Sequence, residues 1–145
     1  MTRIADWREE RARTLAQARV VVVKVGSAVL ADAHGLNVAV LTDLAAQLAA
    51  LRALSVPGLA EPRRVVLVSS GAVAAGRAAL AAHGQHVDTA GLAARQAAAA
   101  VGQGQLVRAW DKAFYAHGVP TAQVLLTREG AVTLVSDGEG VRAAQ

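Results

Sequence analysis

The order of apolar and polar residues predicts a chain that alternates between helices and strands. Residues 4–18 are polar and charged, with apolar side chains at roughly helical spacing, so we expect a short amphipathic helix there. Residues 20–25 read VVVVKV, a β-branched run that is typical of a strand covered on both faces, as in a parallel sheet. A longer helical pattern over 38–54 and a second apolar strand over 63–69 complete a β-α-β unit across 19–69.

The rest of the chain continues this alternation. A helix follows Ser70-Gly71, a longer helix is predicted over 89–116, and a third strand is predicted over 119–126. Because strands and helices alternate, we predict one α/β domain around a largely parallel sheet. Ligands bind such sheets beyond the carboxyl ends of the strands, and both Gly26 and Ser70 stand at those ends.

The side chains at these two strand ends suit an anionic ligand. Lys24 interrupts the first apolar strand, and its ammonium group either meets a phosphate at the strand end or snorkels to water. Gly26 lets backbone N–H groups approach phosphate oxygens closely. Ser70-Gly71 opens a helix whose first N–H groups attract a carboxylate or a phosphate. An ordinary N-cap serine fits the same two residues, so both interpretations stand.

Two glycine patterns resemble nucleotide-binding motifs without meeting their requirements. Gly71 and Gly76 have P-loop spacing, but Arg77-Ala78 follows where that motif needs Lys and then Ser or Thr. Ala78 has no hydroxyl group for a magnesium ion, so we reject the P-loop.

A second glycine pair lies inside the long predicted helix. Gly102 and Gly104 indicate a break in this helix, and they resemble the start of a dinucleotide-binding GxGxxG motif. Val107 stands where the third glycine is required, and the pair follows a helix rather than a strand. The dinucleotide-binding fingerprint is therefore not met.

Composition narrows the chemistry further. The chain has no cysteine, which excludes disulfides, thiolate nucleophiles and cysteine-based zinc sites. Its net charge is +4, but the arginines are dispersed apart from a small N-terminal group, and aromatic residues make up only 3%. Without a platform for stacking bases, nucleic acid is not an expected partner. His83 and His86 lack accompanying ligands, so we expect a solvated loop and no protein metal site.

The hydropathy pattern gives no sign of a membrane partner. The apolar stretches are far shorter than the roughly 20 residues of a membrane-spanning helix. The N-terminal residues are charged throughout and lack the apolar region of a secretory signal. A cytoplasmic protein is the expectation.

Four segments occur in a fixed order: VVVKVGSAVL, VVLVSSGAVAAG, RQAAAAVGQGQL and AQVLLTRE. Together they resemble the N-terminal half of the glutamate 5-kinases, within the amino-acid kinase superfamily, over about residues 19–129. The first segment is shared widely among amino-acid kinases, whereas SSGAVAAG followed by AAVGQ and LLTR is more specific. The kinase half of bifunctional pyrroline-5-carboxylate synthases is similar too. Residues 130–145 depart from the family pattern.

The resemblance implies a fold, a reaction and a set of ligands. The fold is a three-layer α/β/α sandwich with a mostly parallel sheet, incomplete in this chain, and the full-length family implies a homo-oligomer. The reaction is ATP-dependent phosphorylation of the γ-carboxylate of L-glutamate, the first step of proline biosynthesis, with ATP and Mg²⁺. By resemblance, Lys24 is catalytic and binds phosphate with Gly26 and Ser27, and glutamate is held by Ser70, Gly71 and Ala72.

The end of the chain limits what this resemblance implies. In the family, the segment after LLTR carries an Arg-containing helix and Asp and Asn side chains that complete the glutamate site, followed by the nucleotide-binding half. Residues 130–145 match neither, and Asp137 receives no role. We therefore expect residues 1–145 to be inactive alone. The alternative is a non-catalytic module that binds a small molecule or takes part in an assembly.

Overall fold

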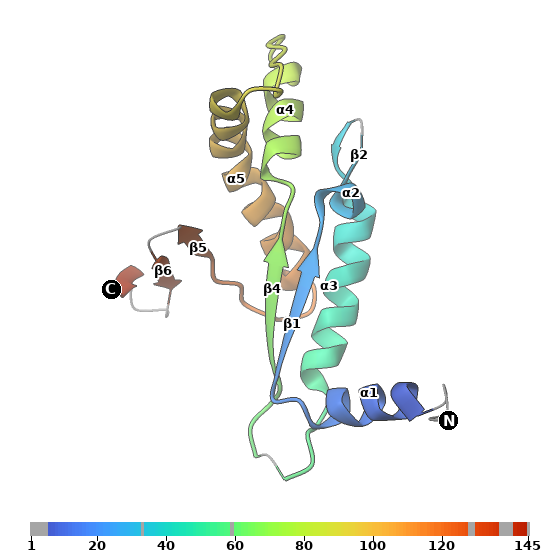
Figure 1. Cartoon of the computed structure of the whole chain (residues 1–145). Helices are drawn as coiled ribbons and strands as arrows, with labels where there is room; N and C mark the ends of the chain where they lie inside the picture. The colour runs from blue at the N-terminus through green and yellow to red at the C-terminus, as the bar shows by residue number, and fades with distance from the viewer. Residues whose placement is uncertain (1–5, 33, 59, 128–129, 137–140, 145) are drawn as a thin grey trace.

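The computed structural model describes residues 6–32, 34–58, 60–127, 130–136 and 141–144, with side chains from residue 7 to residue 125 (Figure 1). The elements are α1 (Asp6–Gln17), β1 (Val20–Val25), α2 (Ser27–Leu30), β2 (Ala31–Asp32), β3 (Gly35–Leu36), α3 (Val38–Ala53), β4 (Arg64–Ser69), α4 (Ala72–Ala82), α5 (Leu92–Tyr115), β5 (Val124–Thr127), β6 (Gly130–Ser136) and β7 (Val141–Ala144).

The predicted β-α-β unit is confirmed. β1 and β4 pair in parallel, from Val20 opposite Arg64 to Val25 opposite Ser69, and α3 connects them. α3 begins where the sequence supplies a cap, since Asn37 accepts a hydrogen bond of 3.2 Å from the backbone N–H of Val40 through its side-chain oxygen. The α/β class predicted from the alternation of elements is therefore present in this unit.

One face of the two-stranded sheet is covered by helices. Figure 1 shows α3 running alongside β1, and the core joins side chains of α3 and α5 to the sheet. Trp110 and Phe114 of α5 stack with their ring centroids 5.8 Å apart. The core side chains of this face, called here the covered face, include Val23, Val25, Leu41, Ala45, Leu48, Val65, Leu67, Leu106, Trp110 and Phe114.

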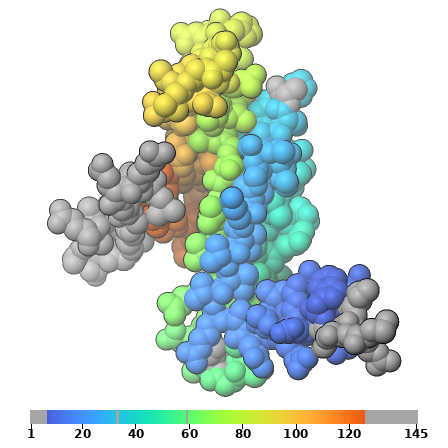
Figure 2. Space-filling model, viewed as in Figure 1, coloured from blue at the N-terminus to red at the C-terminus, as the bar shows by residue number. Residues whose placement is uncertain are grey.

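The opposite face of the same strands is exposed. Every second residue of β1 and β4 points away from the helices, and Val20, Val22, Val66 and Val68 keep 46%, 63%, 47% and 38% of their surface exposed. Figure 2 shows β1 and β4 at the surface of this open face. Burial on both faces, as predicted from the valine run, is wrong for the described residues because helices cover only one side.

The long helix is continuous, which corrects the predicted break. α5 runs for 24 residues through Gly102 and Gly104. A Cβ atom added at Gly102 would overlap the carbonyl oxygen of Ala72 in α4, and one at Gly76 would overlap the carbonyl oxygen of Ala98 in α5. These two glycines therefore serve the close crossing of α4 and α5. The residues between Gly71 and Gly76 are helical, whereas a P-loop needs an irregular loop there, and this agrees with the rejection of that motif.

The third strand forms, but not in the parallel sheet. β5 begins at Val124 rather than at residue 119, and it pairs antiparallel with β6, which pairs antiparallel with β7. Within the described residues, β1 and β4 are the only parallel pair. Thr127 and Gly130 are paired across a two-residue connection, so this local hairpin closes a much shorter loop than a return to β4 would.

The first predicted helix is confirmed over its described part. An arginine from a distant segment forms hydrogen bonds with its C-terminal end. α1 is exposed along its length, including Trp7 and Leu15. Arg63, only 4% exposed, donates hydrogen bonds of 3.0 Å to the carbonyl oxygens of Ala16 and Ala18. A cation is favourable beside the carbonyl groups that end a helix, so Arg63 joins α1 to the start of β4.

Within the described ranges, no helix combines the length and the apolar character that crossing a bilayer requires.

Candidate functional site

The carboxyl ends of β1 and β4 bring the two predicted strand-end motifs together. Val25 is in register with Ser69, and the backbone N–H of Ser70 donates a 3.0 Å hydrogen bond to the carbonyl oxygen of Val25. Lys24 is in register with Val68, one position before this junction. The turn after β1 and the turn after β4 are therefore direct neighbours at one edge of the sheet.

Lys24 lies on the open face. Its side chain is exposed, as are Gly26, Ser27 and Ser70 beyond it. The lysine therefore does not need a partner to offset burial, and its ammonium group is accessible to a ligand that approaches the strand ends. This exposure fits both interpretations given to the lysine, a contact with a phosphate and a side chain that extends into water.

Gly26 leaves space that no side chain fills. Its backbone is extended, with φ −81° and ψ 160°, and a Cβ atom placed there would meet nothing within 4 Å. Neither strain nor crowding within the described chain requires a glycine here. The position is instead open to an incoming group beside Ser27, where α2 begins.

The turn after β4 depends on a glycine with a positive φ angle. Gly71 has φ +118°, a conformation that other residues rarely adopt, and it is buried. An added Cβ would also lie 3.3 Å from a methyl carbon of Leu36 and 3.5 Å from one of Leu106. Gly71 is itself the N-cap residue of α4, so the interpretation of Ser70 as an ordinary N-cap is wrong.

The first turn of α4 keeps its donors free of side-chain caps. Within the described residues no side chain caps this helix, and the carbonyl of Gly71 accepts the first helical bond, from the N–H of Ala75. The N–H groups of the first turn, beginning at Ala72, have no partner one turn back in an α-helix. They carry partial positive charge beside the exposed Ser70, which suits a carboxylate.

A hydrogen-bonded pair behind this turn was not predicted from the sequence. The indole N–H of Trp110 donates a 2.9 Å hydrogen bond to the hydroxyl oxygen of Ser69, and that hydroxyl donates a 2.9 Å bond to the carbonyl oxygen of Ser70. Ser69 and Trp110 are 41 positions apart. The only sequence signal was that two serines, rather than one, end the strand.

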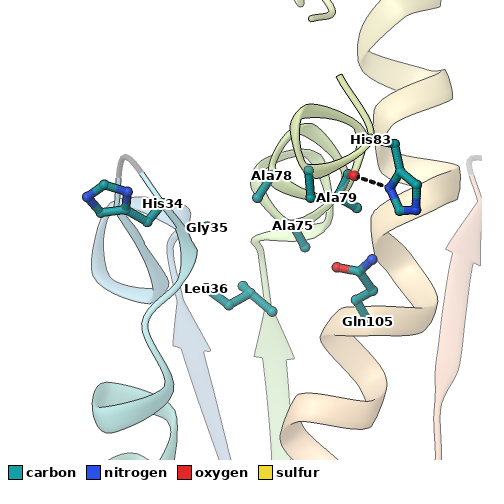
Figure 3. Close-up of a pocket in the computed structure, with 9 residues that line it drawn as sticks. His34, Gly35, Leu36, Ala75, Ala78, Ala79, His83 and Gln105 are labelled. Carbon is teal, nitrogen blue, oxygen red and sulfur yellow. Dashed lines mark hydrogen bonds between the residues drawn. The ribbon is translucent and has the colours of Figure 1, made fainter. Parts of the chain in front are cut away.

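Two cavities of the described structure lie elsewhere. One, of about 370 Å³, separates the β2–β3 hairpin from α4, with His34, Leu36, His83 and Gln105 along its walls (Figure 3). The other, of about 600 Å³, lies beside it and contains Arg77, His86 and Asp88 among its lining residues. Neither is lined by Lys24 or Ser70. The candidate site lies apart from both cavities, at strand ends where Lys24 and Ser70 are exposed.

In the part of the chain that the structure describes, the histidines are not accompanied by a cluster of further ligands. The ring of His83 is hydrogen bonded to the carbonyl oxygen of Ala79, and Figure 3 shows the ring of His34 turned away from α4. Among the residues whose positions are described, no group of three or more His, Asp or Glu side chains can hold a metal ion.

Comparison with known proteins shows the class of protein to which the chain belongs. The model of the amino acid kinase family matches residues 19–143, so the chain belongs to this family of kinases.

Several glutamate 5-kinases resemble the chain more specifically. The glutamate 5-kinase of Nitratidesulfovibrio vulgaris is 53% identical over 124 residues, covering 86% of this chain and 30% of that protein. Those of Oleidesulfovibrio alaskensis and Thermus thermophilus are 48% and 47% identical, covering 86% and 77% of this chain and 30% and 28% of theirs. The chain is thus a homologue of glutamate 5-kinases and spans about 30% of the length of these curated relatives.

Proposed function

We propose that this chain is the N-terminal portion of a glutamate 5-kinase, which transfers the γ-phosphoryl group of ATP to the γ-carboxylate of L-glutamate. One observation carries the proposal: Lys24 and the Ser70-Gly71 turn lie at adjacent carboxyl ends of two parallel strands. Two ligands that bind there would be neighbours, as phosphoryl transfer between them requires.

The chemistry needs little more from the protein than position and charge. A γ-carboxylate oxygen of glutamate attacks the γ-phosphorus of ATP, the bond to the bridging oxygen breaks, and ADP leaves. The nucleophile is already an anion, so no general base is required. A cation and N–H groups directed at the phosphoryl oxygens stabilise the charge of the transition state, and Mg²⁺ bound with ATP adds to this neutralisation.

Each candidate residue has a place in this scheme. The exposed ammonium group of Lys24 contacts the transferred phosphoryl group, and the open space over Gly26 admits its oxygens. The exposed Ser70 and the uncapped start of α4 suit the carboxylate of an amino acid. The proposed phosphate contacts are Lys24, Gly26 and Ser27, and the proposed glutamate contacts are Ser70, Gly71 and Ala72.

The open face supports a second part of the proposal. Four valines of β1 and β4 are at least 38% exposed, and the relatives are about three times longer than this chain. In the whole enzyme, further elements cover this face and complete a three-layer α/β/α sandwich. The same elements supply the remaining contacts to ATP and glutamate. Residues 1–145 alone are accordingly inactive, because lost contacts weaken binding and lost alignment slows the chemical step.

A chimera tests the proposal. Residues 1–127 are joined to the part of the N. vulgaris glutamate 5-kinase that follows the matching segment, and glutamate-dependent ADP release and γ-glutamyl hydroxamate are measured with ATP and Mg²⁺. We expect turnover with L-glutamate, none with L-aspartate, and none from residues 1–145. A folded chimera that releases no ADP in response to glutamate would contradict the proposed function. Turnover by residues 1–145 would contradict the proposed need for the remaining elements.

A further inference from the structure

Two consecutive hydrogen bonds connect the core to the turn after β4. The indole N–H of Trp110 donates to the hydroxyl oxygen of Ser69 at 2.9 Å, and that hydroxyl donates to the carbonyl oxygen of Ser70 at 2.9 Å. A serine hydroxyl has one proton to donate and lone pairs to accept. Since it accepts from the indole, its single proton is free to point at Ser70. We call these two bonds the Trp110–Ser69 relay.

The inner end of the relay is firmly held. Trp110 is 6% exposed and stacks on Phe114, within a helix that the glycine crossing holds against α4. A buried indole N–H without a partner would cost free energy, so the position of Trp110 and that of the Ser69 hydroxyl are coupled. The indole therefore presents its donor from a fixed place in the covered face.

The outer end of the relay holds the carbonyl group of Ser70, in the peptide unit that leads into Gly71. Ser70 donates its backbone N–H to Val25 of β1 at 3.0 Å, and its carbonyl accepts the Ser69 hydroxyl. The next residue, Gly71, then turns with φ +118° into α4. Both polar backbone groups of Ser70 are thus engaged, while its side chain remains at the exposed end of the strand.

We infer that Trp110 and Ser69 are positioning residues, which hold the Ser70-Gly71 turn in the geometry that binds the amino-acid substrate. This rests on the proposed function in one respect, namely that the turn binds glutamate. The residues act through the turn and need not touch the substrate themselves. Their loss should weaken binding of the amino acid, while the phosphoryl group, held from β1, is affected less.

The relay itself is tested in residues 1–145 by NMR. In Ser69→Ala, the indole N–H of Trp110 should exchange with solvent faster, and the amide signals of Ser70 and Gly71 should shift. Trp110→Phe, which keeps an aromatic ring in the core, should shift the same two amides. Ser69→Thr retains a hydroxyl and should leave them near their original positions. Thr121→Val is the matched control, because it removes another 2.9 Å side-chain bond to α5, that of Thr121 to Asp111.

The consequence for binding is tested in the chimera. Ser69→Ala and Trp110→Phe should each raise KM for glutamate about fivefold, the loss expected for one hydrogen bond, with kcat changed less than about twofold. The double variant should be no worse than Ser69→Ala, because both changes break the same connection. Phe114→Leu, which loosens the core without removing a relay group, should lower the Tm without this rise in KM.

The outcomes separate the two proposals. Unchanged Ser70 and Gly71 amides in Ser69→Ala and Trp110→Phe would overturn the positioning role, whatever the chimera does. Additive effects on KM, or an equal rise in KM in Phe114→Leu, would overturn it as well. A chimera without glutamate-dependent turnover would count against the proposed function, and the amide signals would still decide whether the relay holds the turn.

Discussion

The two faces of the β1–β4 sheet are built from the same residue type and have different surroundings. Val23 contacts the helical core, whereas its neighbour Val22 is 63% exposed. The difference arises outside the strands, because α3 and α5 supply leucines and aromatic rings to one side only. A valine run thus predicts a strand, but what covers it depends on the rest of the polypeptide.

The proposed chemistry belongs to the less covered of the two faces. Lys24 alternates with the exposed valines of β1, and Ser70 continues the exposed positions of β4. The covered face contributes rigidity, through the helix crossing and the Trp110–Ser69 relay. If this division is correct, changes to the exposed polar residues at the strand ends should affect catalysis far more than stability, and changes to the packed side chains of the covered face should do the reverse.

The largest expected effect is on catalysis, from an open-face change. Lys24→Ala in the chimera should lower kcat by roughly 30- to 1000-fold, which corresponds to about two to four kcal/mol, because a cation beside the transferred phosphoryl group is lost. KM for glutamate should change much less. Steady-state kinetics measure both constants, and urea unfolding of residues 1–145 carrying the same substitution should show nearly unchanged stability, because the side chain is exposed there. A mild change in kcat would remove Lys24 from the proposed catalytic site.

The second largest expected effect is a loss of stability, caused by a substitution at the crossing of α4 and α5. Gly102→Ala should destabilise residues 1–145 by about 3 kcal/mol, because the new methyl group would overlap the carbonyl oxygen of Ala72 and force α5 away from α4. Urea unfolding followed by circular dichroism measures the free energy of unfolding.

Gly104→Ala provides the matched control in the same helix. The atom nearest to its added methyl group is a guanidinium nitrogen of Arg108 at 3.8 Å, an ordinary contact. Alanine is also favoured over glycine within a helix by up to about 1 kcal/mol, so this variant should be as stable as the original or more so. Equal effects of the two substitutions would show that the α4–α5 crossing is not as close as described.

These glycines also show where prediction from sequence reaches its limit. The β-α-β unit could be predicted because its signals are local: a β-branched run, a helical period over 38–54 and a second apolar run over 63–69. The sequence around Gly102 does not indicate which structural role this glycine has. A glycine within a helical pattern indicates a break or a close neighbour, and the choice depends on Ala72, 30 positions earlier.

Some residues of the candidate site could likewise be predicted from the sequence, and others could not. Lys24, Gly26, Ser70 and Gly71 could be proposed because the ends of parallel strands gather ligand contacts, and the register of β1 and β4 places them at one edge. Trp110 could not be proposed, because its bond to Ser69 joins segments whose packing no local pattern reveals. The pairing of β5 was also missed, since a strand pattern does not specify its partner.

The smallest expected effect is a difference in stability between substitutions of two adjacent valines. It tests the comparison of the two sheet faces most directly. Val23→Ala should destabilise residues 1–145 by about 1.5 kcal/mol, because it removes two methyl groups packed against the covered-face core. Val22→Ala removes the same groups from a side chain that is 63% exposed and should cost less than about 0.5 kcal/mol. Both substitutions lower strand propensity equally, so the difference in unfolding free energy isolates burial. In the chimera, where further elements are proposed to cover the open face, Val22→Ala should become nearly as costly as Val23→Ala. A Val22→Ala cost that stays small there would mean that this face remains exposed in the longer protein.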